Sequence, residues 1–208
     1  MRLISIGVVC AMALAGSIDD AHARTSYAGV KGGVNIADIT GDNLDGLDSR
    51  NRFIGGAFYG MDFTDDFGVR IDGLYVQKGA EGPIPIDDGD IHDVIISLDY
   101  IEFPVLFMVG FPTSDTFAVN LFAGPTFGFN ITAEMEIPEH GETEDLDVET
   151  FELGATFGGG LEYVLTSMSI IADVRYALGG TSINDDFDGK NNGIGIMVGV
   201  KFPFGAGE

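Results

Sequence analysis

The sequence is short of the features that build most disulfide-bonded, catalytic or helical membrane proteins. It contains no tryptophan, one cysteine and three histidines. Beyond the N-terminal segment it has no run of about 18 uninterrupted apolar residues, which argues against a helical membrane protein. Positive charge is also scarce, because ten Lys and Arg stand against 33 Asp and Glu, for a formal net charge of -23. This balance argues against nucleic acid as a partner.

The N-terminal segment has the form of an export signal. A basic start and a mostly apolar stretch up to Ile18 precede Ala21-His22-Ala23, which places small side chains at the two positions that signal peptidase recognises. We therefore predict a cleaved signal peptide at residues 1–23 and one barrel domain at residues 24–208. The only cysteine, Cys10, lies in the leader, so the exported chain depends on backbone pairing and packing rather than on disulfides.

The stretch from Phe117 to Ile131 is the clearest structural signal in the exported chain. It alternates with a period of two, which indicates a strand rather than a helix. One face is apolar throughout, and the other carries small or polar residues with the exception of Phe122. Neither face carries the charged residues that a soluble sheet would turn toward water. The pattern is typical of a barrel wall with lipid outside and a tight, polar interior.

Further stretches show a similar alternation and complete the predicted fold. They are residues 27–37, 53–63, 67–78, 94–109, 151–163, 168–178 and 194–204. The long apolar stretch 94–109 fits two phases, so we expect a β-bulge near Tyr100 to Glu102. The connections alternate long and short without exception. The sequence therefore predicts an all-β, eight-stranded antiparallel up-and-down transmembrane β-barrel with short turns and both termini facing the periplasm.

Four segments also resemble, in order, the hallmark segments of a known family. They are residues 29–35 (GVKGGVN), 75–80 (YVQKGA), 98–104 (LDYIEFP) and 122–125 (FAGP). On these motifs the chain resembles the PorT-type, porin-like outer-membrane β-barrel family along essentially all of its exported part. The resemblance implies an eight-stranded barrel in a Gram-negative outer membrane, and no single activity. One departure is that Gly205 to Glu208 follow Phe204, whereas such barrels commonly end on an aromatic residue.

The predicted inward faces carry charged residues of both signs. They are Lys31, Arg70, Asp72, Glu102, Glu152, Glu162, Asp173, Arg175 and Lys201. Charges in a narrow, poorly solvated lumen are costly unless they are paired, and an eight-stranded barrel has room for little more than its own side chains. We therefore expect a salt-bridged interior that plugs the barrel. An ion or proton pathway is the alternative.

The long connections concentrate the negative charge. Residues 38–50, 81–93, 134–149 and 185–190 hold 20 of the 33 acids. A solvated acidic surface is the favoured interpretation, because the acids lack the ordered spacing of a calcium loop. Binding of Ca²⁺ or Mg²⁺, bridged to lipopolysaccharide phosphates, and steering of a basic partner are the alternatives.

Catalysis is not expected from this sequence. The exported chain keeps only His92 and His140, both in predicted loops, and it has no cysteine nucleophile or cluster of metal ligands. We assign no cofactor, no metal site and no catalytic residue.

The most consistent function is that of a small, monomeric outer-membrane barrel in contact with lipid, with a structural or interaction role in the envelope. A narrow porin-like channel for small solutes or cations is one alternative. A secreted lipocalin-like lipid-binding barrel is the other, and it would require the Phe, Val, Leu and Ile faces to point inward.

Overall fold

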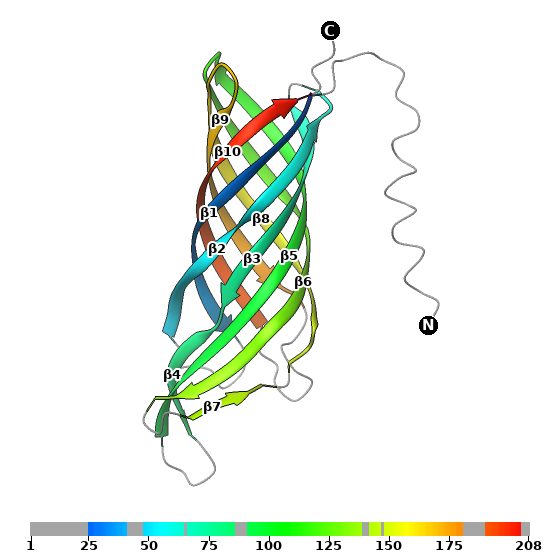
Figure 1. Ribbon diagram of the computed structural model, residues 1–208. Coiled ribbons are helices and arrows are strands. Elements are labelled where there is room, and N and C mark those ends of the chain that lie inside the picture. The colour runs from blue at the N-terminus through cyan, green and yellow to red at the C-terminus, as the bar shows by residue number, and fades with distance from the viewer. Residues whose placement is uncertain are drawn as a thin grey trace, which may run out of the picture.

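The computed structural model describes residues 25–40, 48–64, 66–85, 91–138, 142–146, 148–180 and 190–204. These residues form a single sheet (Figure 1). Its strands are β1 (Thr25–Thr40), β2 (Asp48–Asp62), β3 (Phe67–Lys78), β4 (Ala80–Pro85), β5 (Ile91–Ser114), β6 (Phe117–Ile137), β7 (Glu142–Asp145), β8 (Phe151–Val164), β9 (Ser169–Gly179) and β10 (Lys190–Phe204). Within the described part of the chain no helix is long and apolar enough to span a bilayer. The predicted signal peptide lies outside the described residues.

Eight of the strands close into a barrel. Going around the wall, the order is β1, β2, β3, β5, β6, β8, β9 and β10, and β10 pairs again with β1. Every pairing is antiparallel, so the predicted eight-stranded antiparallel barrel is confirmed. Closure leaves no unpaired edge along these apolar strands. The shorter β4 and β7 are additions that pair with the ends of β2 and β5 and of β6, respectively.

The two ends of the barrel differ. The connections from β2 to β3, from β5 to β6 and from β8 to β9 are short and lie at one end, which we call the turn end (top in Figure 1). Ser26 pairs with Phe204, so the start of β1 and the end of β10 also lie there. The opposite end, from which the longer connections leave, is called the loop end. This arrangement agrees with the alternation of long and short connections in the sequence.

Part of the predicted loop structure is strand. Residues 79–93 were expected to form a loop, but they contain β4 and the start of β5, and β6 continues to Ile137. Gly79 separates β3 from β4 with a φ of 126°, which a glycine adopts without steric cost. The predicted bulge in β5 is wrong, because Leu98, Tyr100 and Glu102 are all buried and β5 keeps one phase. A register shift does occur opposite this point, but the extra residue is on β6: Asp99 pairs with Thr132 and Tyr100 with Asn130.

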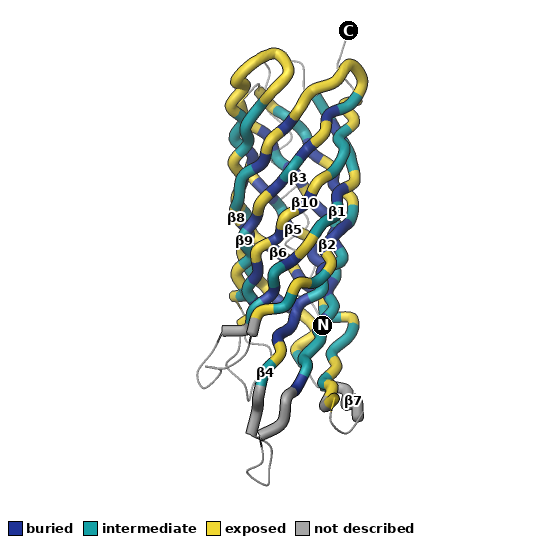
Figure 2. Tube along the Cα trace, turned by 90° about the vertical axis from the view of Figure 1, so that its left-hand side faces the viewer, coloured by how far each residue is buried: buried dark blue, intermediate teal, exposed yellow. Residues whose placement is uncertain are grey.

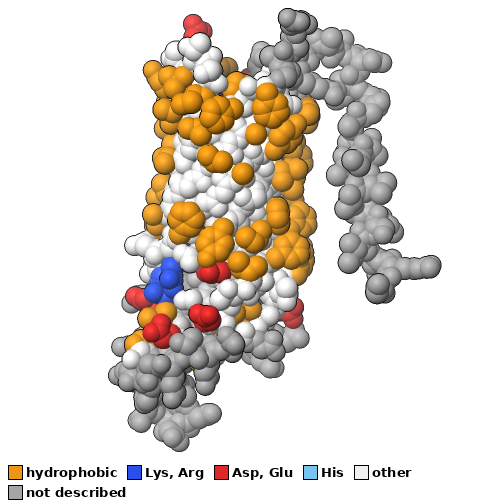
Figure 3. All heavy atoms as spheres, in the orientation of Figure 1, with side chains coloured by type: hydrophobic (Ala, Val, Ile, Leu, Met, Phe, Trp, Pro, Cys, Tyr) orange, Lys and Arg blue, Asp and Glu red, His pale blue; other side chains and the backbone are white. Residues whose placement is uncertain are grey.

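The faces of the strands follow the predicted alternation. Leu121 is 51% exposed and its neighbour Phe122 is 4% exposed, while Val198 is 64% exposed and Met197 is 1% exposed. Buried and exposed residues alternate along the strands in Figure 2. Figure 3 shows apolar side chains over the wall and charged ones gathered toward the loop end. The large apolar faces therefore point outward, which contradicts the lipocalin-like alternative.

The interior contains apolar layers as well as charges. One layer is made by Ile54, Leu74, Val76 and Met197, and a second by Leu106, Met108 and Phe122. Tyr27, Phe58 and Ile171 pack together nearer the turn end, and Ala80, Leu98 and Tyr100 nearer the loop end. Ile54 and Phe58 put large apolar side chains on the inner face of β2 as well, so its two faces differ less in the sequence than those of β6.

The lipid-facing assignment is tested by placing a cation on the outer wall. Val198→Arg should prevent stable insertion into membranes, because an arginine facing lipid at mid-bilayer costs about 2 to 4 kcal/mol. The measurement is the fraction of heat-modifiable protein in the membrane pellet. Thr166→Arg, in an exposed turn, is the control and should insert normally. Equal insertion of both variants would show that the outer face is misassigned.

Two adjacent glycines of β1 test how tightly the wall is packed. An added Cβ at the inward Gly33 would collide with the backbone oxygen of Ile196, whereas at the outward Gly32 the nearest atom is 3.7 Å away. Gly33→Ala should therefore lower the free energy of unfolding by about 1 to 3 kcal/mol, in the range of overpacking. Gly32→Ala is the matched control and should leave it nearly unchanged. Urea unfolding in lipid vesicles measures both, and equal effects would refute the packing argument.

Candidate functional site in the barrel interior

The inward positions of six strands bring the charged residues together. All nine residues selected from the sequence lie on the inner wall, at alternate positions of β1, β3, β5, β8, β9 and β10. Strand alternation accounts for this placement, because every second side chain of a barrel strand faces the lumen. All nine are ion-paired, and together with Lys78 they form two groups of four charged residues and one separate pair.

The first group, the turn-side quartet, consists of Lys31, Arg70, Asp72 and Asp173. The Nζ of Lys31 lies 2.8 Å from Asp72 and 2.9 Å from Asp173. The guanidinium of Arg70 lies 2.9 Å from each of the same two carboxylates. Two cations and two anions thus share one buried cluster, so that no charge in it lacks a counter-charge.

Aromatic rings support the same cluster. The guanidinium carbon of Arg70 lies 5.0 Å from the ring centroid of Phe122 and 5.5 Å from that of Phe58. A cation over an aromatic face is attracted by the ring quadrupole. Phe122, the large apolar residue on the otherwise small and polar face of β6, therefore has a role as a support for Arg70.

The second group, the loop-side quartet, consists of Lys78, Glu102, Glu152 and Arg175. Lys78 Nζ lies 2.9 Å from Glu102 and 2.8 Å from Glu152, and Arg175 lies 3.0 Å from Glu102. Asn191 donates a hydrogen bond of 2.8 Å to Glu152. Leu74 and Val76 follow Asp72 on the inner face of β3 before Lys78, so an apolar layer separates this quartet from the first.

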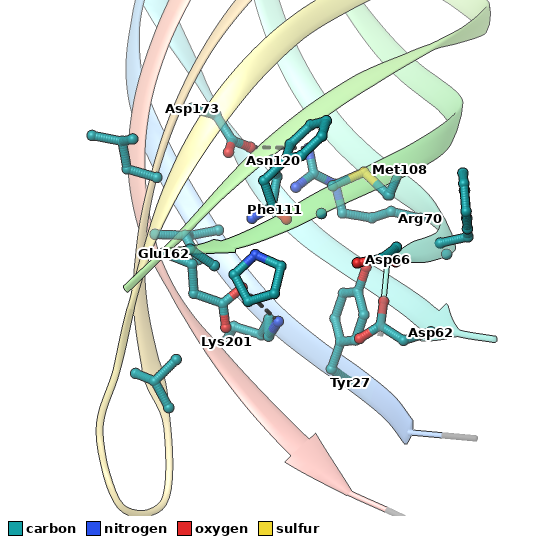
Figure 4. A pocket seen from close by; sticks show the side chains of 18 of the residues that line it. Tyr27, Asp62, Asp66, Arg70, Met108, Phe111, Asn120, Glu162, Asp173 and Lys201 are labelled. Carbon is teal, nitrogen blue, oxygen red and sulfur yellow. Dashed lines mark hydrogen bonds and ion pairs between the residues drawn. The ribbon is translucent and has the colours of Figure 1, made fainter. Parts of the chain in front are cut away.

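The remaining pair lies nearest the turn end. Lys201 Nζ donates a hydrogen bond of 2.7 Å to Glu162 (Figure 4), and it lies 4.5 Å from the ring centroid of Tyr27. Thr126 and Thr156 form a further polar contact of 2.7 Å between β6 and β8 in the buried interior. The ion-paired side chains of the described interior comprise five cations and five anions, which makes this set electrically neutral.

Sequence reasoning missed two members of the network. The alternation of β3 places Lys78 on the same face as Arg70 and Asp72, but Lys78 was not included among the interior charges. Asn191 was assigned to a loop, whereas it is the second residue of β10 and is buried. Nothing in its local pattern marks it as an inward residue.

Other predicted sites cannot be placed in this way. Most of the acids proposed to bind Ca²⁺ or Mg²⁺ lie in connections that are outside the described residues or whose side chains are not described. Among the residues that are described, no group of three or more His, Cys, Asp or Glu side chains is arranged to hold a metal ion. The side chain of His92 is not described, and His140 lies outside the described residues.

Comparison with known proteins places the chain in a family. The model of the outer membrane protein beta-barrel domain family matches residues 2–202. The chain belongs to this family. It is accordingly a protein of the outer membrane, as the alternation and the resemblance had indicated, although the narrower PorT-type assignment stays a prediction. No curated protein sequence matches the chain significantly.

Solved structures of outer-membrane proteins are similar to this barrel. Neisserial surface protein A (NspA) matches with a TM-score of 0.51 and 15% identity, over 88% of this chain and 98% of that one. Ail of Yersinia pestis, solved with the heparin analogue sucrose octasulfate, matches at 0.47 and 18%, over 88% and 100%. OprG of Pseudomonas aeruginosa matches at 0.48 and 13%, over 88% and 97%. At these identities NspA supports the fold alone.

The ion pairs predict a stability effect that can be measured. Asp173→Asn leaves Lys31 and Arg70 to share a single carboxylate, and removing one partner of a buried ion pair typically costs about 3 to 5 kcal/mol. The free energy of unfolding, measured with urea in lipid vesicles, should fall by about this amount. Asp115→Asn in an exposed turn is the charge-matched control and should change it by less than about 0.5 kcal/mol. Equal stability of the two variants would contradict the buried network.

Proposed function

We propose that this protein is a closed, non-conducting barrel with a structural or interaction role in the outer membrane. The observation that supports this is the ion pairing across the lumen. β3 and β9 lie on opposite sides of the wall, since three strands separate them in either direction around the barrel. The contact of 2.9 Å between Arg70 and Asp173 joins these opposite walls directly.

The loop-side quartet supports the same proposal at a second level. Lys78 on β3 reaches Glu152 on β8, and Arg175 on β9 reaches Glu102 on β5, and neither pair belongs to neighbouring strands. Moving a solute through the lumen would require both quartets to separate, leaving buried charges without partners, which is strongly unfavourable. The barrel then serves to hold its loop end above the membrane.

The proposal extends to partners. The wall contacts membrane lipid, and the barrel acts as a monomer without catalytic activity. The acidic connections offer oxygen ligands to divalent cations, which can bridge them to lipopolysaccharide phosphates. The alternative function is a narrow channel for small cations, favoured by the acidic connections because negative charge at a mouth concentrates cations.

Planar-bilayer recording separates the two functions. The wild-type protein should insert without ion conductance. The double variant Glu102→Ala, Arg175→Ala keeps the net charge and removes side chains that cross the lumen, so it should raise the conductance. Insertion is verified for both by heat modifiability on gels. Stepwise, cation-selective conductance of the wild-type protein would overturn the closed barrel and establish the channel.

A further inference from the structure

The turn end of the lumen contains a cavity that the ion-pair network does not fill. Its volume is about 170 Å³. Arg70 and Asp173 of the turn-side quartet border it, and Asp66, Phe111 and Val164 border it close to the short turns (Figure 4). The cavity therefore lies between the plugged interior and the end of the barrel that faces the periplasm.

The lining of this cavity is charged unequally. Four carboxylates and two cationic side chains line it: Asp62, Asp66, Glu162, Asp173, Arg70 and Lys201. Arg70 is ion-paired with Asp173, and Lys201 is ion-paired with Glu162. Among the described residues, Asp62 and Asp66 have no ion-pair partner. The charge left unpaired in the cavity is therefore negative, and a bound cation would neutralise it.

Polar side chains without a protein partner face the cavity. Tyr27 is only 3% exposed, and no described residue makes a hydrogen bond with its hydroxyl group. Asn120 is half-buried, and no described residue makes a hydrogen bond with its side-chain amide. Figure 4 shows Tyr27 beside Asp62 at the cavity, with Asn120 across from them. A buried polar side chain is normally hydrogen-bonded, so the hydroxyl of Tyr27 takes its partner from inside the cavity, either water or a ligand.

The size and the remaining lining restrict that partner further. A cavity of about 150 Å³ accommodates benzene, so this one fits a molecule of roughly six non-hydrogen atoms. Met108, Leu161 and Ile171 supply apolar surface next to the polar groups. Such a mixture suits a short organic chain with one charged end better than a bare metal ion, and the described residues offer no metal-binding group of three His, Cys, Asp or Glu.

We propose that this cavity binds a small primary ammonium compound from the periplasmic side. Its ammonium group lies between the carboxylate of Asp62 and the hydroxyl of Tyr27, which accept its hydrogen bonds. Its short apolar chain packs against Met108 and Ile171. The site is a blind pocket in a closed barrel, so binding requires no conduction and is separate from the structural role proposed above.

The test uses pentylammonium, which has six non-hydrogen atoms, added to the isotope-labelled barrel in detergent micelles. The side-chain amide signal of Asn120 reports on the cavity itself rather than on the micelle. We expect a saturable shift of this signal. The neutral 1-pentanol and the anionic butanoate have the same number of non-hydrogen atoms and should bind at least about tenfold more weakly, because charge-assisted hydrogen bonds are the stronger ones.

Two variants connect the binding to the named groups. Asp62→Asn keeps the shape and removes the charge, so it should weaken pentylammonium binding by about tenfold or more. Tyr27→Phe removes only the hydroxyl and should weaken it several-fold. Asp115→Asn, at the same end of the barrel but outside the cavity, is the control and should bind as the wild-type protein does. Heat modifiability verifies that each variant is folded, and Tyr27→Phe carries the test alone should Asp62→Asn fail to fold.

Three results would overturn the proposal. The first is the absence of a saturable shift with pentylammonium, which would mean that the cavity holds only water. The second is equal affinity for pentylammonium and 1-pentanol, which would mean that the charge plays no part. The third is unchanged binding in the folded variants of Asp62 and Tyr27.

Discussion

The pairing of buried charges is the constraint on which this barrel depends. Ionised side chains lie in an interior that an eight-stranded wall leaves little room to hydrate. Each quartet satisfies its charges by reaching across the lumen, as Arg70 does to Asp173 and Arg175 to Glu102. The same contacts that neutralise the charges also tie non-adjacent strands together. Stability and the proposed closure of the lumen would therefore have a common cause.

The rest of the wall is adapted to this interior. Inward glycines such as Gly33 let the strands approach closely, and outward residues such as Val198 present apolar surface to lipid. Phe122 breaks the polar character of its face, and it supports the guanidinium of Arg70. Near the turn end the described residues leave a cavity beside Tyr27.

Much of this fold could be predicted from the sequence, because the geometry of a β-strand makes its side chains alternate between the two faces of the wall. β3 was predicted with its observed bounds, and the inward orientation of Arg70 and Asp72 followed from the alternation along it. β4 was missed because it is short and contains a glycine and two prolines, and β7 because it is short and polar; both pair with longer neighbours. The partners of each inward charge depend on how strands far apart in the sequence are staggered around the barrel. Local periodicity contains no information about this stagger. The cavity beside Tyr27 was missed for the same reason.

The central claim is that the lumen is closed to water-borne solutes, and cysteine labelling tests it most directly. The sequence has one cysteine, Cys10, in the predicted leader, so an introduced cysteine is unique in the processed chain. Thr156 is buried inside the barrel, whereas Ser167 is exposed in a turn. The account predicts that a small charged thiol reagent labels the folded Ser167→Cys variant rapidly and leaves the folded Thr156→Cys variant unmodified. Rapid labelling of Thr156→Cys would contradict a closed interior.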